Sequence, residues 1–251
     1  MSATQPNTVR LGLRYAPAVL VDPGAVFRHV AESGRYGWTL GALLLLTTLI
    51  GWATVETGLI DRQVDGETLT RLAELEREQF DLLSRAELSE RLEKIRKSAE
   101  FTKLIRRGGA VLAAPASLLA SVMLIAALLF AAVALTGNKA EYATLLAVCV
   151  YAAVIWVLAA GLRLAMMLAF RTLEVDTSLA LLVPGREGFE TLRTILSAID
   201  PFRVWFWILV GTGAVVTGQL SRRWAVITCT LFCLVASGAR LIPLPAGLPG
   251  S

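Results

Sequence analysis

Long runs of apolar residues alternate along this chain with shorter polar segments. Five apolar runs, over residues 38–60, 110–136, 142–170, 204–220 and 224–242, are long enough to form transmembrane helices, which need about 20 residues to cross a bilayer core. The pattern predicts an all-α integral membrane protein with one span in 36–60 and four in 109–243. Because five is odd, the termini are expected on opposite faces of the membrane.

Two further segments have the pattern of amphipathic helices. Asp22 and Pro23 are an N-cap and a first helical residue, and apolar positions after them share one face, which predicts an interfacial helix over 22–35. A similar interfacial helix is expected within 171–203. Residues 1–21 and 244–251 lack any sustained period and are expected to be flexible tails.

The segment 61–108 has a different character from the rest of the chain. It contains 11 acidic and 11 basic residues, with leucines at helical spacing, and Ser84 and Glu87 match a capping box. These features predict an extramembrane helical hairpin of helices 67–83 and 85–107, ended by Gly108–Gly109. We expect its apolar positions to dock on the chain's own membrane domain or on a partner subunit; a solvated spacer is the alternative. These candidate contact residues are Leu69, Leu72, Leu75, Leu88, Leu92 and Ile95.

The apolar runs contain small residues and a few ionisable ones. Small residues let helices approach closely in lipid, and the candidate helix-packing positions are Ala113, Ser117, Ser121, Gly211, Ala214 and Gly218. Ionisable residues at membrane depth are candidate functional groups by default, and here these are Glu56, Arg163 and Arg240. All three lie near helix ends, which favours snorkelling or a structural ion pair.

The sequence lacks the motifs of a catalytic or cofactor site. There is no phosphate-binding loop, no nucleophile elbow and no metalloprotease motif, and a single histidine provides no credible general acid–base pair. We therefore expect no enzyme activity, no cofactor, no metal and no nucleic-acid binding. Basic residues between apolar runs are expected to face lipid headgroups instead.

The order of these elements resembles the bacterial branch of the Yip family (Ypt-interacting proteins). Members open with a "P-x-x-x-F" helix, which Pro23 to Phe27 match, and follow with one span and a charged loop, here 61–108. A proline in a small-residue span, here Pro115, is similar too. So is the amphipathic helix that leads through aromatic residues into a glycine-bearing span, here Leu192 to Gly218.

The resemblance implies a five-span protein of the bacterial cytoplasmic (inner) membrane with its N-terminus in the cytoplasm and no catalytic residues. It implies an accessory or scaffold role, with an ABC-type export complex as a candidate partner. The positive-inside rule conflicts with this orientation, because it places the hairpin's 11 basic residues outside. A small transporter or channel and a membrane-shaping protein remain the alternatives; the oligomeric state is left open.

Overall fold

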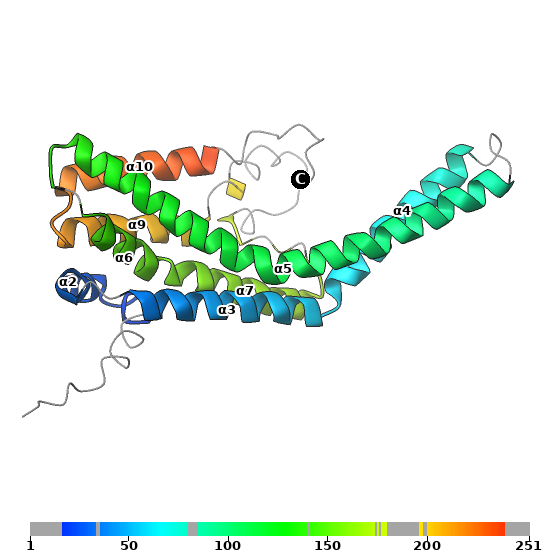
Figure 1. Cartoon of the computed structure of the whole chain (residues 1–251), viewed down its shortest axis with the longest axis horizontal. Coiled ribbons are helices and arrows are strands. Elements are labelled where there is room, and N and C mark those ends of the chain that lie inside the picture. The colour runs from blue at the N-terminus through cyan, green and yellow to red at the C-terminus, as the bar shows by residue number, and fades with distance from the viewer. Residues whose placement is uncertain are drawn as a thin grey trace, which may run out of the picture. The chain divides into compact units, whose positions relative to one another are not determined.

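The computed structural model of this protein describes residues 17–33, 36–79, 85–139, 141–173, 175, 177–179, 196–197 and 200–238. All its long elements are helices (Figure 1). In chain order they are α2 (Pro23–Ser33), α3 (Gly37–Glu56), α4 (Leu59–Gln79), α5 (Arg85–Leu135), α6 (Tyr142–Ala152), α7 (Val154–Phe170), α9 (Pro201–Val216) and α10 (Arg222–Gly238).

Three of these helical segments are long and apolar enough to cross a membrane: Gly37–Glu56, Ser89–Leu135 and Tyr142–Phe170. The third comprises α6 and α7, with a break at Ala153. The helix α9 is apolar but shorter, at 16 residues. The chain is thus an all-helical membrane protein with three candidate membrane-spanning helices.

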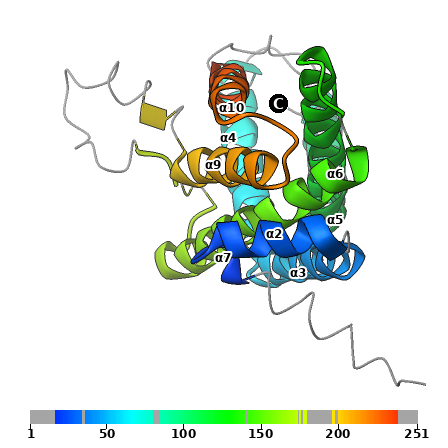
Figure 2. The ribbon, with the colours of Figure 1, turned by 90° about the vertical axis from the view of Figure 1, so that its left-hand side faces the viewer.

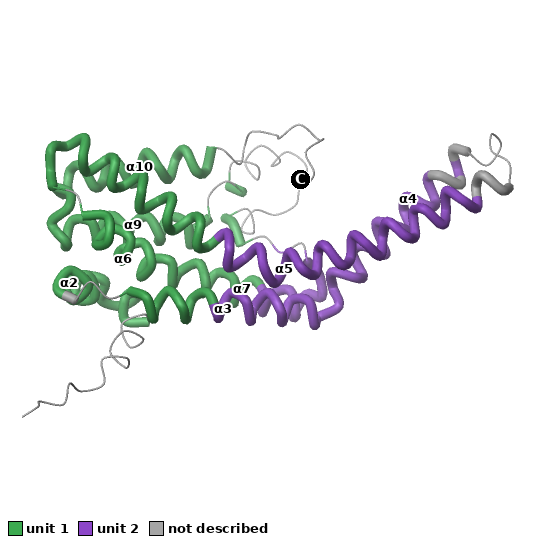
Figure 3. Tube along the Cα trace, viewed as in Figure 1, with its two compact units in different colours: residues 1–44, 118–163, 176–251 green, residues 45–117, 164–175 purple. Residues whose placement is uncertain are grey.

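The chain divides into two compact units (Figure 3). Unit 1 comprises residues 1–44, 118–163 and 176–251, and unit 2 comprises residues 45–117 and 164–175. The unit boundaries fall within α3, α5 and α7, so these helices contribute residues to both units.

Helix α2 starts where the sequence predicts it, and its apolar face packs inside unit 1. The backbone N–H of Ala25 donates to Asp22 Oδ1 at 3.0 Å, and Val26, Phe27 and Val30 are at most 1% exposed. They pack against α6 and α9, so this apolar face is covered by protein; a membrane-interface position for α2 remains a prediction. Val19 is also fully buried, so the prediction of a flexible tail is wrong at this residue; residues 1–16 lie outside the described residues.

The helix α9 connects the other helices of unit 1. It lies between α10 on one side and α2 and α6 on the other (Figures 1 and 2). A Cβ atom on Gly213 would lie 2.4 Å from Val148 Cγ1 of α6 and 3.2 Å from Phe27 Cδ1 of α2. Glycine is therefore what lets α2, α6 and α9 meet at this point.

Both ends of α9 are set by local sequence. Its N-cap is Asp200, whose Oδ1 accepts from the N–H of Phe202 at 3.0 Å. Beyond its C-terminus Gly218 has φ +72°, and the N–H groups of Gly218 and Gln219 donate to the carbonyls of Val215 and Ala214, which is a Schellman motif. Within this chain Gly218 is exposed and supplies a left-handed turn, so its packing role stays a prediction for contacts outside the chain.

The packing face of α5 also differs from the prediction. In unit 1 its buried residues are Leu118, Val122, Ala126, Leu129 and Val133. In contrast, Ala113 and Ser117 are exposed and Ser121 is half-buried. Larger apolar side chains form this face because they make more van der Waals contacts with the neighbouring helices, and such packing is what drives helix association in lipid. The predicted stripe remains a hypothesis only for contacts outside the chain. By contrast, Ala214 is buried and Gly211 faces Cys229 of α10.

In unit 2, α3 and α5 come into backbone contact. A Cβ atom on Gly51 of α3 would lie 2.1 Å from the carbonyl oxygen of Ala110 in α5. Helix α5 runs unbroken through Gly108 and Gly109, so the prediction that these glycines end a helix is wrong. Glycine lowers helix stability without forbidding the helix. The residues on either side of the two glycines, Arg107 and Ala110, contact α4 and α3 and hold this segment.

Candidate partner-binding helix pair

Two arginines of α5 clamp two carboxylates of α4 in unit 2. Arg106 Nη1 and Nη2 donate to Glu67 Oε1 and Oε2 at 3.0 and 2.9 Å. Arg107 Nε donates to Asp61 Oδ1 at 2.9 Å, and its Nη2 donates to Asp61 Oδ2. Both contacts are bidentate, which is the geometry that fixes orientation as well as distance.

A lysine adds a third link between the two helices. Lys103 Nζ lies 2.8 Å from Asp65 Oδ1 and 2.9 Å from Glu100 Oε1, and the Lys103 side chain is only 16% exposed. Exposed ion pairs contribute little to stability singly. Three in one register, however, specify how α4 lies against the first part of α5, which runs antiparallel to it (Figure 1).

The arginine contacts change how the carboxylates of α4 titrate. The hydrogen bonds from Arg107 hold the pKa of Asp61 below its usual value, and those from Arg106 do the same for the pKa of Glu67. A carboxylate whose pKa is lower in the paired state than in the unpaired state stabilises the pairing when the pH is above its unpaired pKa. That stabilisation is lost as the pH falls through the paired value.

We expect α4 and α5 to stay paired at neutral pH and to separate progressively below about pH 4, near the pKa of free Asp and Glu. Spin labels at the exposed positions Thr70 and Lys94 would report this as a broadened distance distribution. A variant carrying Asp61→Asn and Glu67→Gln should give the broadened distribution at every pH. Identical distributions for the unsubstituted chain at pH 7 and at about pH 2, well below the pKa of free Asp and Glu, would refute the expectation.

The predicted contact residues of the helix pair differ in how exposed their side chains are. Leu72, Leu92 and Ile95 are half-buried, while Leu69 is 66% exposed. The side chains of Leu75 and Leu88 lie outside the described residues. Leu69 and Leu72 border a hollow of about 500 Å³ between α4 and α5, with Arg96 and Glu100 also on its walls. Leu69 is therefore open to a partner.

A second exposed apolar group was missed by the sequence reasoning. Phe101, Leu104, Ile105 and Leu112 of α5 are between 56 and 70% exposed. Their spacing places them along one side of a helix. The sequence contains this signal, but it crosses Gly108–Gly109, where the helix was predicted to end.

The ionisable candidates of the spans do not form one site. Glu56 is exposed at the last position of α3. Arg163 is exposed and its Nη2 donates to Thr177 Oγ1 at 3.2 Å. Arg240 lies outside the described residues.

The described part of the chain offers no cluster for metal chemistry. No group of three His, Cys, Asp or Glu side chains among these residues could hold a metal ion. Cys149 and Cys229 are buried and Cys233 is half-buried, all as free thiols. The helix pair presents exposed apolar side chains beside ion-paired charges, a surface suited to binding another protein rather than to catalysis.

Apolar membrane-spanning helices joined to a charged, ion-paired helix pair define the chain as an integral membrane protein in contact with lipid. Its sequence matches the model of the Yip1 domain over residues 18–239. The chain belongs to the Yip1 family, as the order of its elements predicts. No curated protein and no solved structure matches it.

Proposed function

We propose that this chain is a non-catalytic accessory or scaffold protein that binds and helps to assemble or stabilise a membrane protein complex through the α4–α5 pair. The candidate complex is an ABC-type export system in a bacterial inner membrane, which the family resemblance supports. The observation that carries the proposal is the exposed Leu69 beside a helix pair whose register three ion links specify.

The polar residues that a transport path would need have structural partners instead. Thr144 Oγ1 donates to Glu141 Oε2 at 2.7 Å, and Thr217 Oγ1 donates to the carbonyl of Gly213 at 2.8 Å. Gln219 Oε1 accepts from the N–H of Glu141 at 3.0 Å. Among the described residues, the buried polar side chains are Thr, Ser and Gln only. These hydrogen bonds favour a scaffold over a transporter.

The membrane-shaping alternative loses one of its two supports. That role relies on amphipathic helices that insert an apolar face between lipids. The apolar face of α2 is buried against α6 and α9. Most of the second predicted helix, in 171–203, lies outside the described residues.

Purification in a mild detergent followed by mass spectrometry tests the proposed role. We expect stoichiometric recovery of other membrane subunits with the chain, because a scaffold's contacts survive gentle extraction. Recovery of the chain alone, or only as a homo-oligomer with a measurable flux in liposomes, would favour the transporter and contradict the scaffold role.

The proposed topology is five spans with the N-terminus in the cytoplasm, so α9 and α10 must also cross the membrane. At 1.5 Å per residue, α9 is about 24 Å long, short of the bilayer core of about 30 Å, and flanking residues or local thinning must cover the difference. Cysteines introduced at Ser2 and Ser251, in a chain whose native cysteines are replaced, should be labelled by an impermeant reagent from opposite sides. Labelling of both from one side would exclude an odd number of spans.

A further inference from the structure

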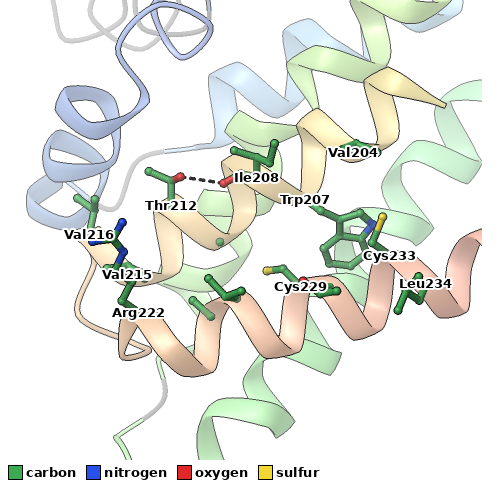
Figure 4. Close-up of a pocket in the computed structure, with 14 residues that line it drawn as sticks. Val204, Trp207, Ile208, Thr212, Val215, Val216, Arg222, Cys229, Cys233 and Leu234 are labelled. Carbon is green, nitrogen blue, oxygen red and sulfur yellow. Dashed lines mark hydrogen bonds between the residues drawn. The ribbon is translucent and has the colours of Figure 1, made fainter. Parts of the chain in front are cut away.

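An apolar groove lies between α9 and α10 in unit 1 (Figure 4). Its volume is about 540 Å³, within the range of about 300–1,000 Å³ of small-molecule sites. Val204, Trp207 and Ile208 of α9 and Val226 and Leu234 of α10 contribute to its walls. The groove therefore offers an apolar surface along two helices of a membrane protein.

The walls of this groove provide little for a polar ligand to bind. Of the two hydroxyls in the lining, those of Thr212 and Thr230, that of Thr212 already donates to the carbonyl of Ile208 at 2.8 Å, as Figure 4 shows. Cys229 and Cys233, which also line the groove, are weak hydrogen-bonding groups. An occupant must therefore be apolar over most of its length.

One end of the groove is charged. Arg222, the first residue of α10, lines the groove beside Val215 and Val216 at the end of α9 (Figure 4). This arginine is exposed and makes no ion pair with any described residue. By contrast, Nη1 of Arg203 donates to the carbonyl of Ala236 at 2.7 Å. The guanidinium of Arg222 is thus available to an anion at the end of an apolar groove.

We propose that this groove holds one acyl chain of an anionic phospholipid, with the lipid phosphate at Arg222. The acyl chain contacts the α9 and α10 walls, while the guanidinium contacts the phosphate oxygens, a pairing that arginine geometry suits. Basic residues beside grooves between membrane helices recognise anionic headgroups in this way. This site is independent of the α4–α5 pair and of the proposed scaffold role.

The dimensions favour a lipid chain over a helix of a second protein. A helix, about 10 Å across with its side chains, is too wide to lie within the groove and could place only side chains in it. An acyl chain is narrow enough to lie between two adjacent helices. The positive charge at one end matches the single phosphate of a phospholipid.

Native mass spectrometry of the full chain in detergent tests this site with two matched pairs of variants. Phosphatidylglycerol and phosphatidylcholine with identical acyl chains serve as the anionic and zwitterionic probes. Arg222→Gln removes the charge at the groove, and Arg223→Gln removes the adjacent charge, which does not line it. Val226→Trp fills the groove, whereas Ile227→Trp adds the same bulk at an exposed neighbour outside it.

We expect one retained phosphatidylglycerol and about fivefold weaker retention in Arg222→Gln, the factor for losing one cation near a lipid surface. Arg223→Gln and Ile227→Trp should retain it as the unsubstituted chain does, and Val226→Trp should lose it. Equal retention of both lipids, equal effects of the two arginine variants, or full retention in Val226→Trp would overturn the proposal. So would a homodimer that only Val226→Trp abolishes, since a second copy would then occupy the groove.

Discussion

Substituting alanine for Gly51 is expected to remove most of the folded protein. The new methyl carbon would lie 2.1 Å from the carbonyl oxygen of Ala110, 3.0 Å from its carbonyl carbon and 3.1 Å from Val111 Cα. All three are backbone atoms, so no side chain can rotate away and α3 must move off α5. Overpacking typically costs about 1–3 kcal/mol and occasionally more, and contact with rigid backbone places this site at the upper end.

A glycine in the same unit provides the matched control. A Cβ atom on Gly66 of α4 would meet nothing within 4 Å, so Gly66→Ala should stabilise the helix by about 0.5–1 kcal/mol. The monodisperse fraction after heating in detergent, measured by size-exclusion chromatography, separates the two variants. If Gly51→Ala withstands heating as well as Gly66→Ala does, the close approach of α3 and α5 is not a structural requirement.

Capping signals can be read from the sequence because they act within one turn of a helix. The pair Asp22–Pro23 begins α2 as expected. The same pair at Asp200–Pro201 begins α9, three residues before the span that the apolar run predicts from residue 204. The carboxylate caps the N–H groups that follow it, so the signal belongs to the helix after it.

Signals that depend on tertiary contact could not be read correctly from the sequence. The glycines at 108 and 109 resemble a helix end, but contacts made by their neighbours keep α5 continuous. Gly51 and Gly213 are essential to packing only because particular backbone or side-chain atoms lie opposite them. No spacing rule within one span reveals what another helix places there.

In the charged segment, too, the helices can be predicted from local sequence and the contacts between them cannot. Its composition and leucine spacing predict two helices rich in both charges, as α4 and α5 are. They do not predict that Arg107 pairs with Asp61 and Arg106 with Glu67, because a shift of one turn would offer other carboxylates. Which carboxylate each arginine meets depends on the tertiary arrangement of α4 and α5, which local propensity does not determine.

The second large effect is expected from replacing residues 64–106 with a short Gly/Ser linker. This change leaves Gly51, Ala110 and the Asp61–Arg107 pair in place, so membrane insertion should be unaffected. It removes Leu69, its neighbours on α4 and the exposed Phe101, Leu104 and Ile105. Because these are the surfaces proposed to contact the partner, binding should be lost.

A single substitution tests the contribution of Leu69 to partner binding without removing the helix pair. Leu69→Asp introduces a charge at the exposed contact residue while the ion pairs of Asp61, Asp65 and Glu67 remain. Thr70→Asp adds the same charge at the adjacent exposed position. We expect Leu69→Asp to weaken partner binding by about 1 kcal/mol or more, the usual threshold for an interface residue that matters, and Thr70→Asp to leave it unchanged.

The most direct test of the central claim is quantitative mass spectrometry of the subunits that co-purify with the full chain and with the linker variant, at equal amounts of inserted protein. If the α4–α5 pair determines what this protein binds, the partner is abundant with the full chain and falls to background with the linker variant. Recovery of the partner at the full-chain level with the linker variant would contradict the claim.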